Sequence, residues 1–144
     1  MKHLIFYVLI KLMDTLRNHK LQESISFALR GIWQAIKNER NIKIELGFAF
    51  WAIVAGFAFG ITKTEWLAII IIVFAILSAE ILNSSIESLC NLVRDEENLG
   101  YKKTKLTRDI AAGAVMLLAI GSVVLGLVIF LPYIFAALSN VLVL

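Results

Sequence analysis

The segment that decides the fold is residues 66–87, WLAIIIIVFAILSAEILNSSIE. A helix needs about 20 apolar residues to cross a hydrocarbon layer about 30 Å thick. The uncharged part of this segment, residues 66–79, supplies only about 21 Å of helix. The membrane helix must therefore continue through Glu80 to Asn83. The sequence thus predicts a carboxylate at or below the membrane surface, where such groups are costly and usually mark a functional site.

The composition also indicates a membrane protein. Of the 144 residues, 60% are hydrophobic and 17% are charged, whereas a soluble domain has about 45–50% apolar and about 25% charged residues. These values exclude a water-soluble enzyme. The single cysteine, Cys90, cannot form an internal disulfide. The two histidines, His3 and His19, are too few for a Cys/His metal cluster.

Two further segments are long and apolar enough to span the membrane. They cover about residues 44–62 and 110–131. Pro132 follows the second of them, and we expect it to mark the membrane exit or a kink because proline cannot donate an amide hydrogen bond. Together with residues 66–87, these segments predict three transmembrane helices.

The N-terminal part of the chain is less apolar. Residues 22–38 place apolar side chains at helical spacing, and such an amphipathic helix lies on a membrane surface. Residues 1–19 form an N-terminal extension whose short apolar run, residues 4–10, is interpreted as an interfacial helix because no signal-peptide cleavage site follows it. The predicted fold is an all-α membrane protein with an amphipathic surface helix and three transmembrane helices.

Basic residues are distributed unevenly around the three spans. Eight precede the first span, one lies between the first and second, five lie between the second and third, and none follows. The positive-inside rule therefore puts the N-terminus and the loop over residues 88–109 in the cytoplasm and the C-terminus outside. The net charge of +3 indicates membrane orientation rather than a nucleic-acid partner. The cluster over residues 102–108 is typical of a membrane-surface anchor, although nucleotide phosphates require the same charges.

Glu80 belongs to a polar stripe on its helix. At about 100° per residue, Asn83, Ser84, Glu87 and Asn91 share its face, so the stripe runs from the membrane to the cytoplasm. Its position suits Glu80 to act as a general base toward a lipid-soluble alcohol.

Two carboxylates nearer water suit a cation. Glu87 offers the hard oxygen ligands that bind Mg²⁺ together with substrate phosphates. Glu39, just before the first span, is a second candidate, whereas Glu45 points about 120° away from it and is less suited to share the ion. The sequence contains neither a GxxxxGK[ST] loop nor a GxGxxG turn, so phosphates would not be bound by a conventional nucleotide fold.

Each acidic residue also has an ordinary structural explanation. Glu80 could pair with a neighbouring helix or relay protons in a transporter, and Glu87 could be an interfacial charge. Glu39 and Lys43 have the i, i+4 spacing of a helix ion pair. Asp109, in the first turn of the third span, could complement the helix dipole.

Residues 79–87, AEILNSSIE, closely resemble the signature E-I-L-N-[ST]-[AS]-I-E of the small bacterial integral-membrane lipid kinases, the diacylglycerol kinase and undecaprenol kinase family. Three further stretches agree with this family in order and approximate spacing. They are SFALRGI at 26–32, ERNIKI at 39–44 and RDIAAGAV at 108–115. The resemblance covers about residues 20–135.

The resemblance implies a homotrimer with active sites between subunits and a lipid kinase domain over residues 20–144. It implies ATP-dependent, Mg²⁺-dependent phosphorylation of a membrane lipid alcohol. Residues 39–44 resemble the undecaprenol branch, although Glu45 resembles the diacylglycerol branch, so undecaprenol is favoured and diacylglycerol is the alternative. A non-catalytic, proton-coupled transporter or assembly protein is the alternative of a different class. A proton relay needs polar groups toward the outside, however, and residues 67–75 contain none.

The resemblance also implies roles for individual residues. Glu80 matches the general base, and Asn83 matches a polar residue of the active site. Glu39 and Glu87 match ligands of ATP and of the metal. The other positions that match ATP-binding residues of the family are Arg108 and Asp109, in place of a Lys-Asp pair, together with Lys20 and Phe27.

The chain departs from the family pattern in four places. Asn91 stands where most members have aspartate, and Arg108 replaces the usual lysine. The loop over residues 94–107 lacks the usual E-Y-H element, and residues 1–19 have no counterpart. None of these departures affects Glu80, Asn83 or Glu87.

Overall fold

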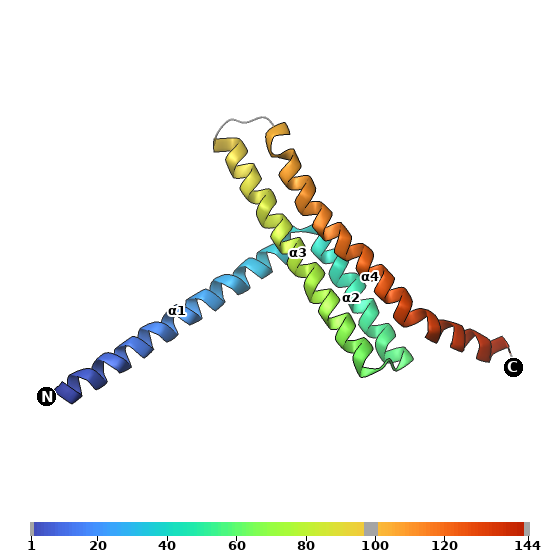
Figure 1. The fold of residues 1–144 in the computed structure, drawn as a ribbon, viewed down its shortest axis with the longest axis horizontal. Coiled ribbons are helices and arrows are strands. Elements are labelled where there is room, and N and C mark those ends of the chain that lie inside the picture. Colours follow the sequence, from blue (N-terminus) through green and yellow to red (C-terminus); the bar gives the residue numbers. More distant parts are fainter. Residues whose placement is uncertain (1, 97–100, 143–144) are drawn as a thin grey trace. The chain divides into compact units, whose positions relative to one another are not determined.

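The computed structural model describes residues 2–96 and 101–142, with side chains described for residues 20–96 and 101–140. These residues form four helices and no strand, which confirms the predicted all-α class (Figure 1). The helices are α1 (Lys2–Asn38), α2 (Arg40–Phe59), α3 (Lys63–Glu96) and α4 (Lys102–Leu142). The chain divides into two units, α1 and the part that begins at Glu39, and each is described by itself.

The first unit is one continuous helix, α1. The sequence predicted separate helices over residues 4–10 and 22–38, whereas α1 runs without a break from Lys2 to Asn38. Ile32 and Trp33 are exposed within this unit, as expected for an apolar face that meets a membrane surface or another chain. The helix is confirmed, and its place at a membrane surface stays a prediction.

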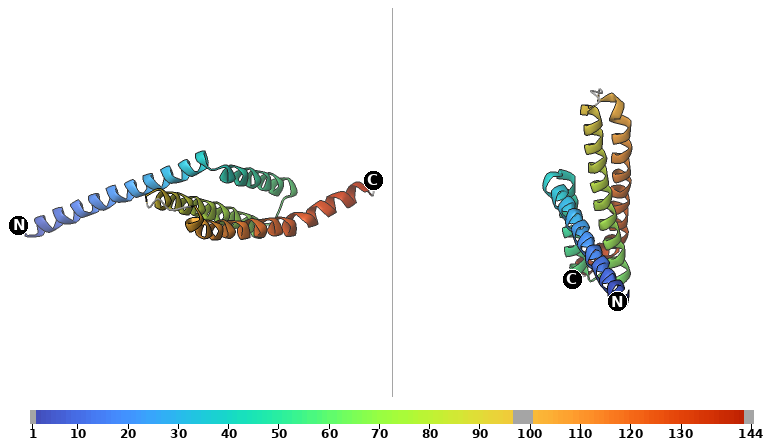
Figure 2. Two further views of the ribbon diagram at one scale, coloured as in Figure 1. Left: turned by 90° about the horizontal axis from the view of Figure 1, so that it is seen from above. Right: turned by 90° about the vertical axis from the view of Figure 1, so that its left-hand side faces the viewer.

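The second unit contains the three predicted spans. Helices α2, α3 and α4 are each long and apolar enough to cross a membrane. They extend beyond the predicted segments, except that α2 ends at Phe59, three residues before the predicted end of the first span. Helix α3 packs against both α2 and α4, and it lies beside α4 along most of its length (Figures 1 and 2).

Helix α4 continues through Pro132 to Leu142. Its last part turns away from the direction of its first part (Figure 2). Proline bends a helix because it removes an intrahelical hydrogen bond and its ring meets the preceding turn. Pro132 therefore does not end the helix, and the bend agrees with the kink that the sequence predicted.

The turn between α2 and α3 is closed by glycines. Gly60 adopts a left-handed conformation with φ 64° and ψ 45°, and the amide of Ile61 donates to the carbonyl oxygen of Gly56 over 3.2 Å. This pattern is a Schellman-type helix end, for which glycine has no steric cost. Gly56 also lies under the Trp66 ring, because a Cβ atom at Gly56 would be 2.8 Å from Trp66 Cη2.

A capping box begins α3 and holds α4 against it. The Thr62 amide donates to Glu65 Oε2 over 2.7 Å, and the Glu65 amide donates to Thr62 Oγ1 over 3.3 Å. These reciprocal bonds satisfy amides at the start of the helix. The Tyr133 hydroxyl of α4 donates to the same Glu65 oxygen over 2.9 Å. Beside them, Ile69 and Ile129 are buried in an apolar cluster.

Candidate functional site

The inward face of α3 carries the acidic residue that the sequence singled out. The buried residues of this helix are Ile69, Ile76, Glu80, Asn83 and Cys90, which recur at the spacing of one helix face. Glu80 is 2% exposed and Asn83 is 7% exposed. Glu80 and Asn83 of the predicted polar stripe therefore face the other helices, as expected for a functional carboxylate in a membrane.

Two buried oxygen atoms near this face lack a hydrogen-bond partner within the described residues. They are Asn83 Oδ1 on α3 and Glu45 Oε2 on α2. Buried polar atoms almost always have partners in folded proteins, and an unpaired one calls for an explanation. Both atoms are hydrogen-bond acceptors, so a ligand group that donates a hydrogen bond, such as a hydroxyl, would satisfy one of them.

Glu45 also borders a groove between α2, α3 and α4. The groove has a volume of about 450 Å³, and its lining is mostly apolar, with Asn41, Glu45 and Ser122 as its polar side chains. The Ser122 hydroxyl donates to the carbonyl oxygen of Ala119 in its own helix over 2.8 Å. The Glu45 carboxylate interacts electrostatically with that of Glu80. Glu45 thus borders the apolar groove and also interacts with the buried acid.

Apart from the comparison of the two family branches, sequence reasoning judged Glu45 by its angle from Glu39 on one helix. That angle predicts that Glu45 does not share an ion with Glu39, and it says nothing about α3. The electrostatic interaction between Glu45 and Glu80 arises from the packing of α2 on α3. The available signal was a second acidic residue, Glu45, at the start of the predicted first span.

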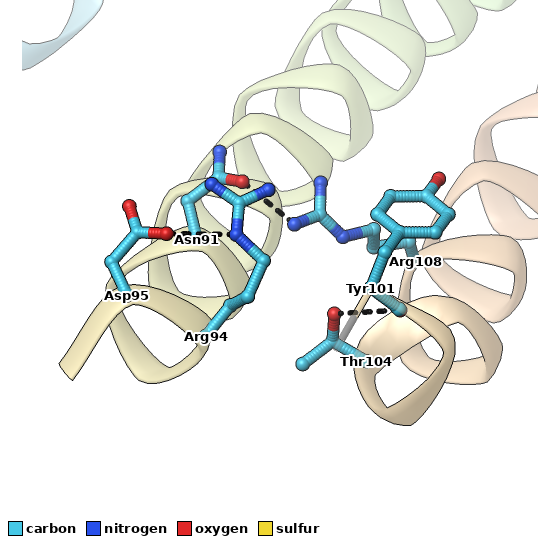
Figure 3. Close-up of polar contacts among 6 residues, drawn as sticks. All are labelled: Asn91, Arg94, Asp95, Tyr101, Thr104 and Arg108. Atoms are coloured by element: carbon cyan, nitrogen blue, oxygen red, sulfur yellow. Dashed lines mark hydrogen bonds and ion pairs between the residues drawn. The ribbon is translucent and has the colours of Figure 1, made fainter. Parts of the chain in front are cut away.

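Beyond Glu80 and Asn83, the polar stripe reaches Asn91, which contacts α4 (Figure 3). Arg108 Nη2 donates to Asn91 Oδ1 over 2.7 Å, and the guanidinium carbon lies 5.2 Å from the centroid of the Tyr101 ring. Arg108 Nε is buried and has no acceptor within the described part of the chain. The structure therefore joins Arg108, a predicted ATP-binding residue, to the stripe of α3.

Asp109 follows Arg108 and pairs with Lys105 one turn earlier on α4. Helix α4 begins at Lys102 and has no acidic residue in its first turn. The interpretation of Asp109 as a first-turn residue that complements the helix dipole is therefore wrong. Hydropathy marks where the apolar span begins, at residue 110, and the helix itself begins eight residues earlier, at Lys102.

The two candidate metal ligands lie on different helices of the second unit. Glu39 is the N-cap residue of α2, and its carboxylate makes no capping hydrogen bond to that helix, while Glu87 is half-buried on α3. The described residues contain no group of three or more His, Cys, Asp and Glu side chains that could hold a metal. This donor set fits Mg²⁺, which usually takes one or two carboxylates and completes its shell with phosphate oxygens and water.

The last two candidates, Lys20 and Phe27, lie on α1. Both are exposed within that unit. The Arg30 guanidinium lies over the Phe27 ring, 5.9 Å from its centroid. Because α1 is a unit of its own, the roles of Lys20 and Phe27 stay predictions.

The chain is similar to known proteins over most of its length. A family model described as prokaryotic diacylglycerol kinase matches residues 26–130. Undecaprenol kinase of Bacillus subtilis (strain 168) is 34% identical over 110 residues, which cover 76% of this chain and 87% of that protein. A diacylglycerol kinase of Synechocystis sp. (strain ATCC 27184 / PCC 6803 / Kazusa) is 28% identical over 112 residues, which cover 76% of this chain and 61% of that protein. No solved structure matches the chain significantly.

These matches agree with the geometry of the second unit. The family model covers all of α2 and α3 and the first part of α4, which together carry the buried Glu80, the groove and the Arg108 cluster. The resemblance predicted from residues 79–87 is thereby confirmed. The chain belongs to the prokaryotic diacylglycerol kinase family and is a membrane lipid kinase.

Proposed function

We propose that the protein transfers the γ-phosphate of ATP to the hydroxyl group of undecaprenol. The lipid oxygen forms a bond to phosphorus, the bond between the γ-phosphorus and the bridging oxygen breaks, and the products are undecaprenyl phosphate, ADP and a proton. The observation that carries this proposal is the burial of Glu80, which is 2% exposed on the inward face of a membrane helix. The similarity to undecaprenol kinase over most of both chains favours this alcohol.

In this proposal, Glu80 is the general base. A lipid hydroxyl approaches from within the membrane and loses its proton to the Glu80 carboxylate as the new bond forms. Before transfer, the hydroxyl donates its single hydrogen bond to the unpartnered oxygen of Glu45 or of Asn83, and this bond orients the alcohol until its proton passes to Glu80. Orienting the reacting groups is a large part of catalysis in phosphoryl transfer.

The lining of the groove favours a polyprenol over a diacylglycerol. A polyprenol has one hydroxyl group on a hydrocarbon chain, whereas a diacylglycerol also carries two ester carbonyls that accept hydrogen bonds. Of the three polar side chains in the lining, Glu45 is an acceptor when ionised and Ser122 already donates to its own helix. Only Asn41 could donate to an ester. The diacylglycerol alternative therefore has less support from the groove.

We assign the ATP site to the cytoplasmic end of α3 and α4. Arg108 neutralises phosphate charge, and Asp109, Glu39 and Glu87 complete the nucleotide site. Lys20 and Phe27 match further ATP-binding positions of the family. Glu39 and Glu87 would hold Mg²⁺, which supplies further charge neutralisation when it is bound. In phosphoryl transfer the protein mainly positions groups and stabilises charge, and these side chains have the chemistry for both.

The same proposal covers assembly and location. A homotrimer would complete each site with residues from a neighbouring copy. The exposed apolar side chains of α2 and α4, such as Phe48 and Leu117, supply surface for lipid and for such neighbours. The basic residues favour the bacterial cytoplasmic membrane, with the N-terminus and residues 88–109 in the cytoplasm and the C-terminus outside. The alternative of a proton-coupled transporter has no support, since the buried α3 positions on the outer side of Glu80 are Ile69 and Ile76.

A side-by-side assay tests the proposed function. The purified protein is reconstituted into phospholipid vesicles that contain either undecaprenol or diacylglycerol, and transfer from γ-labelled ATP is measured with Mg²⁺ present. We expect a higher kcat/KM for undecaprenol. A higher value for diacylglycerol would overturn the substrate assignment, and transfer to neither lipid would overturn the proposed reaction.

A further inference from the structure

Arg108 is held from two sides by groups that leave its charge in place. Its Nη2 atom donates to the neutral amide of Asn91 over 2.7 Å, and its guanidinium lies over the Tyr101 ring (Figure 3). The Tyr101 backbone is itself fixed, because its carbonyl oxygen accepts a hydrogen bond from the Thr104 amide over 3.3 Å. Neither contact supplies a negative charge.

The acidic side chains around this cluster are paired with other cations. Asp95 interacts electrostatically with Arg108, but its Oδ1 atom accepts a hydrogen bond from Arg94 Nε over 2.8 Å. Asp109 is paired with Lys105. Within the described residues, Arg108 therefore has one hydrogen bond, to an uncharged acceptor, and its buried Nε donor has none.

A guanidinium that is held in place but not neutralised by an ion pair is suited to bind an anion. It has five N–H donors in a planar fork, and the bond to Asn91 removes part of the side-chain freedom that would otherwise be lost when phosphate binds. A carboxylate at position 91 would hold Arg108 equally well but would form an ion pair and offset its charge. An asparagine holds the arginine and preserves its attraction for phosphate.

We propose that Asn91 is a positioning residue for ATP, which acts by holding Arg108 in place without neutralising it. This inference rests on the proposed role of Arg108 in binding ATP. It adds a residue to which the resemblance to the family gave no role, and it gives the departure from aspartate at this position a physical meaning.

The proposal has two parts: Asn91 holds Arg108 in place, and Asn91 does not neutralise it. Asn91→Ala tests the first part and Asn91→Asp tests the second. Asn91→Ala removes the acceptor and lets Arg108 move, so we expect the KM for ATP to rise about five- to tenfold while kcat and the KM for the lipid change less than about twofold. Asn91→Asp keeps the acceptor but adds a charge, and we expect a smaller rise in the KM for ATP that shrinks as salt is added. Ser88→Ala, at an exposed position on the same helix, is the matched control and should leave these constants unchanged.

A double-mutant cycle with Arg108→Ala shows whether Asn91 acts through Arg108. We expect Asn91→Ala to have no further effect on the KM for ATP once Arg108 is gone. An additive effect in the double variant, an equal rise in the KM for the lipid, or an unchanged KM for ATP in Asn91→Ala would each overturn the proposal.

Equilibrium binding separates this inference from the proposed reaction. The titrant is AMP-PNP with Mg²⁺, which binds without turnover, and the protein is the full chain in lipid nanodiscs. If Asn91→Ala weakens AMP-PNP binding while the wild type phosphorylates no lipid, the proposed lipid phosphorylation is wrong and the positioning role of Asn91 stands. If Arg108→Ala weakens binding and Asn91→Ala does not, the inference is wrong and the ATP site stands.

Discussion

Glu45 of α2 and Glu80 of α3 interact electrostatically through their carboxylates, although 35 residues separate them in the sequence. Glu80 is almost fully buried, and one oxygen of Glu45 is buried without a partner in the described part of the chain. Glu45 also borders the apolar groove. One acidic group thus borders the apolar groove and the other is buried beside it in the bundle, and they are expected to have different roles.

The first prediction concerns Glu80. Glu80→Gln keeps the size and polarity of the side chain but removes its basicity, so kcat for lipid phosphorylation should fall by about 10²- to 10⁴-fold. Equilibrium binding of AMP-PNP and thermal stability in detergent should stay close to the wild type. Retention of most of the activity would remove Glu80 from the role of base.

The second prediction concerns Glu45. Glu45→Leu removes the acceptor that we assign to the substrate hydroxyl, so the KM for the lipid alcohol should rise by about three- to tenfold with little change in the KM for ATP. Glu45→Gln retains a carbonyl oxygen and should change the KM for the lipid less. The matched pair is compared by initial rates at varied lipid mole fraction, and a larger effect of glutamine than of leucine would contradict the role.

The third prediction concerns the contact between Gly56 and Trp66. A Cβ atom at Gly56 would lie 2.8 Å from Trp66 Cη2 and 2.9 Å from Cζ2, which is closer than van der Waals contact allows. Gly56→Ala should therefore destabilise the packing of α2 on α3 by about 1–3 kcal/mol. Gly47→Ala, on the same helix, is the control, because a Cβ atom there has nothing within 4 Å. Thermal unfolding of both variants in the same detergent measures the difference, and equal stabilities would contradict the clash.

The fourth prediction concerns the Tyr101 ring over Arg108. Tyr101→Leu removes a cation–π contact of about 0.5–1 kcal/mol at an exposed site, so the KM for ATP should rise by about two- to fivefold. Tyr101→Phe retains the ring and should behave almost as the wild type does. A loss in the phenylalanine variant as large as in the leucine variant would show that the hydroxyl matters and not the ring.

Much of the site was predictable because helix geometry is local. The 100° rotation per residue placed Glu80, Asn83 and Asn91 on one face, and the structure buries Glu80 and Asn83 and brings Asn91 against α4. The capping box Thr62–Glu65 and the terminal glycine of α2 are likewise patterns of adjacent residues. The start of α4 at Lys102 was not predicted. An apolar segment indicates which residues lie in the membrane, and it does not indicate where the helix begins outside the membrane.

The sequence by itself determined three membrane helices and a carboxylate within one of them, because crossing hydrocarbon requires a minimum length of apolar helix. The tertiary structure alone decided that Glu45 interacts electrostatically with Glu80 and that Asn91 holds Arg108. Both interactions depend on the rotation of one helix against another. That rotation is set by the side chains that interlock along the whole interface, so no short stretch of sequence predicts it.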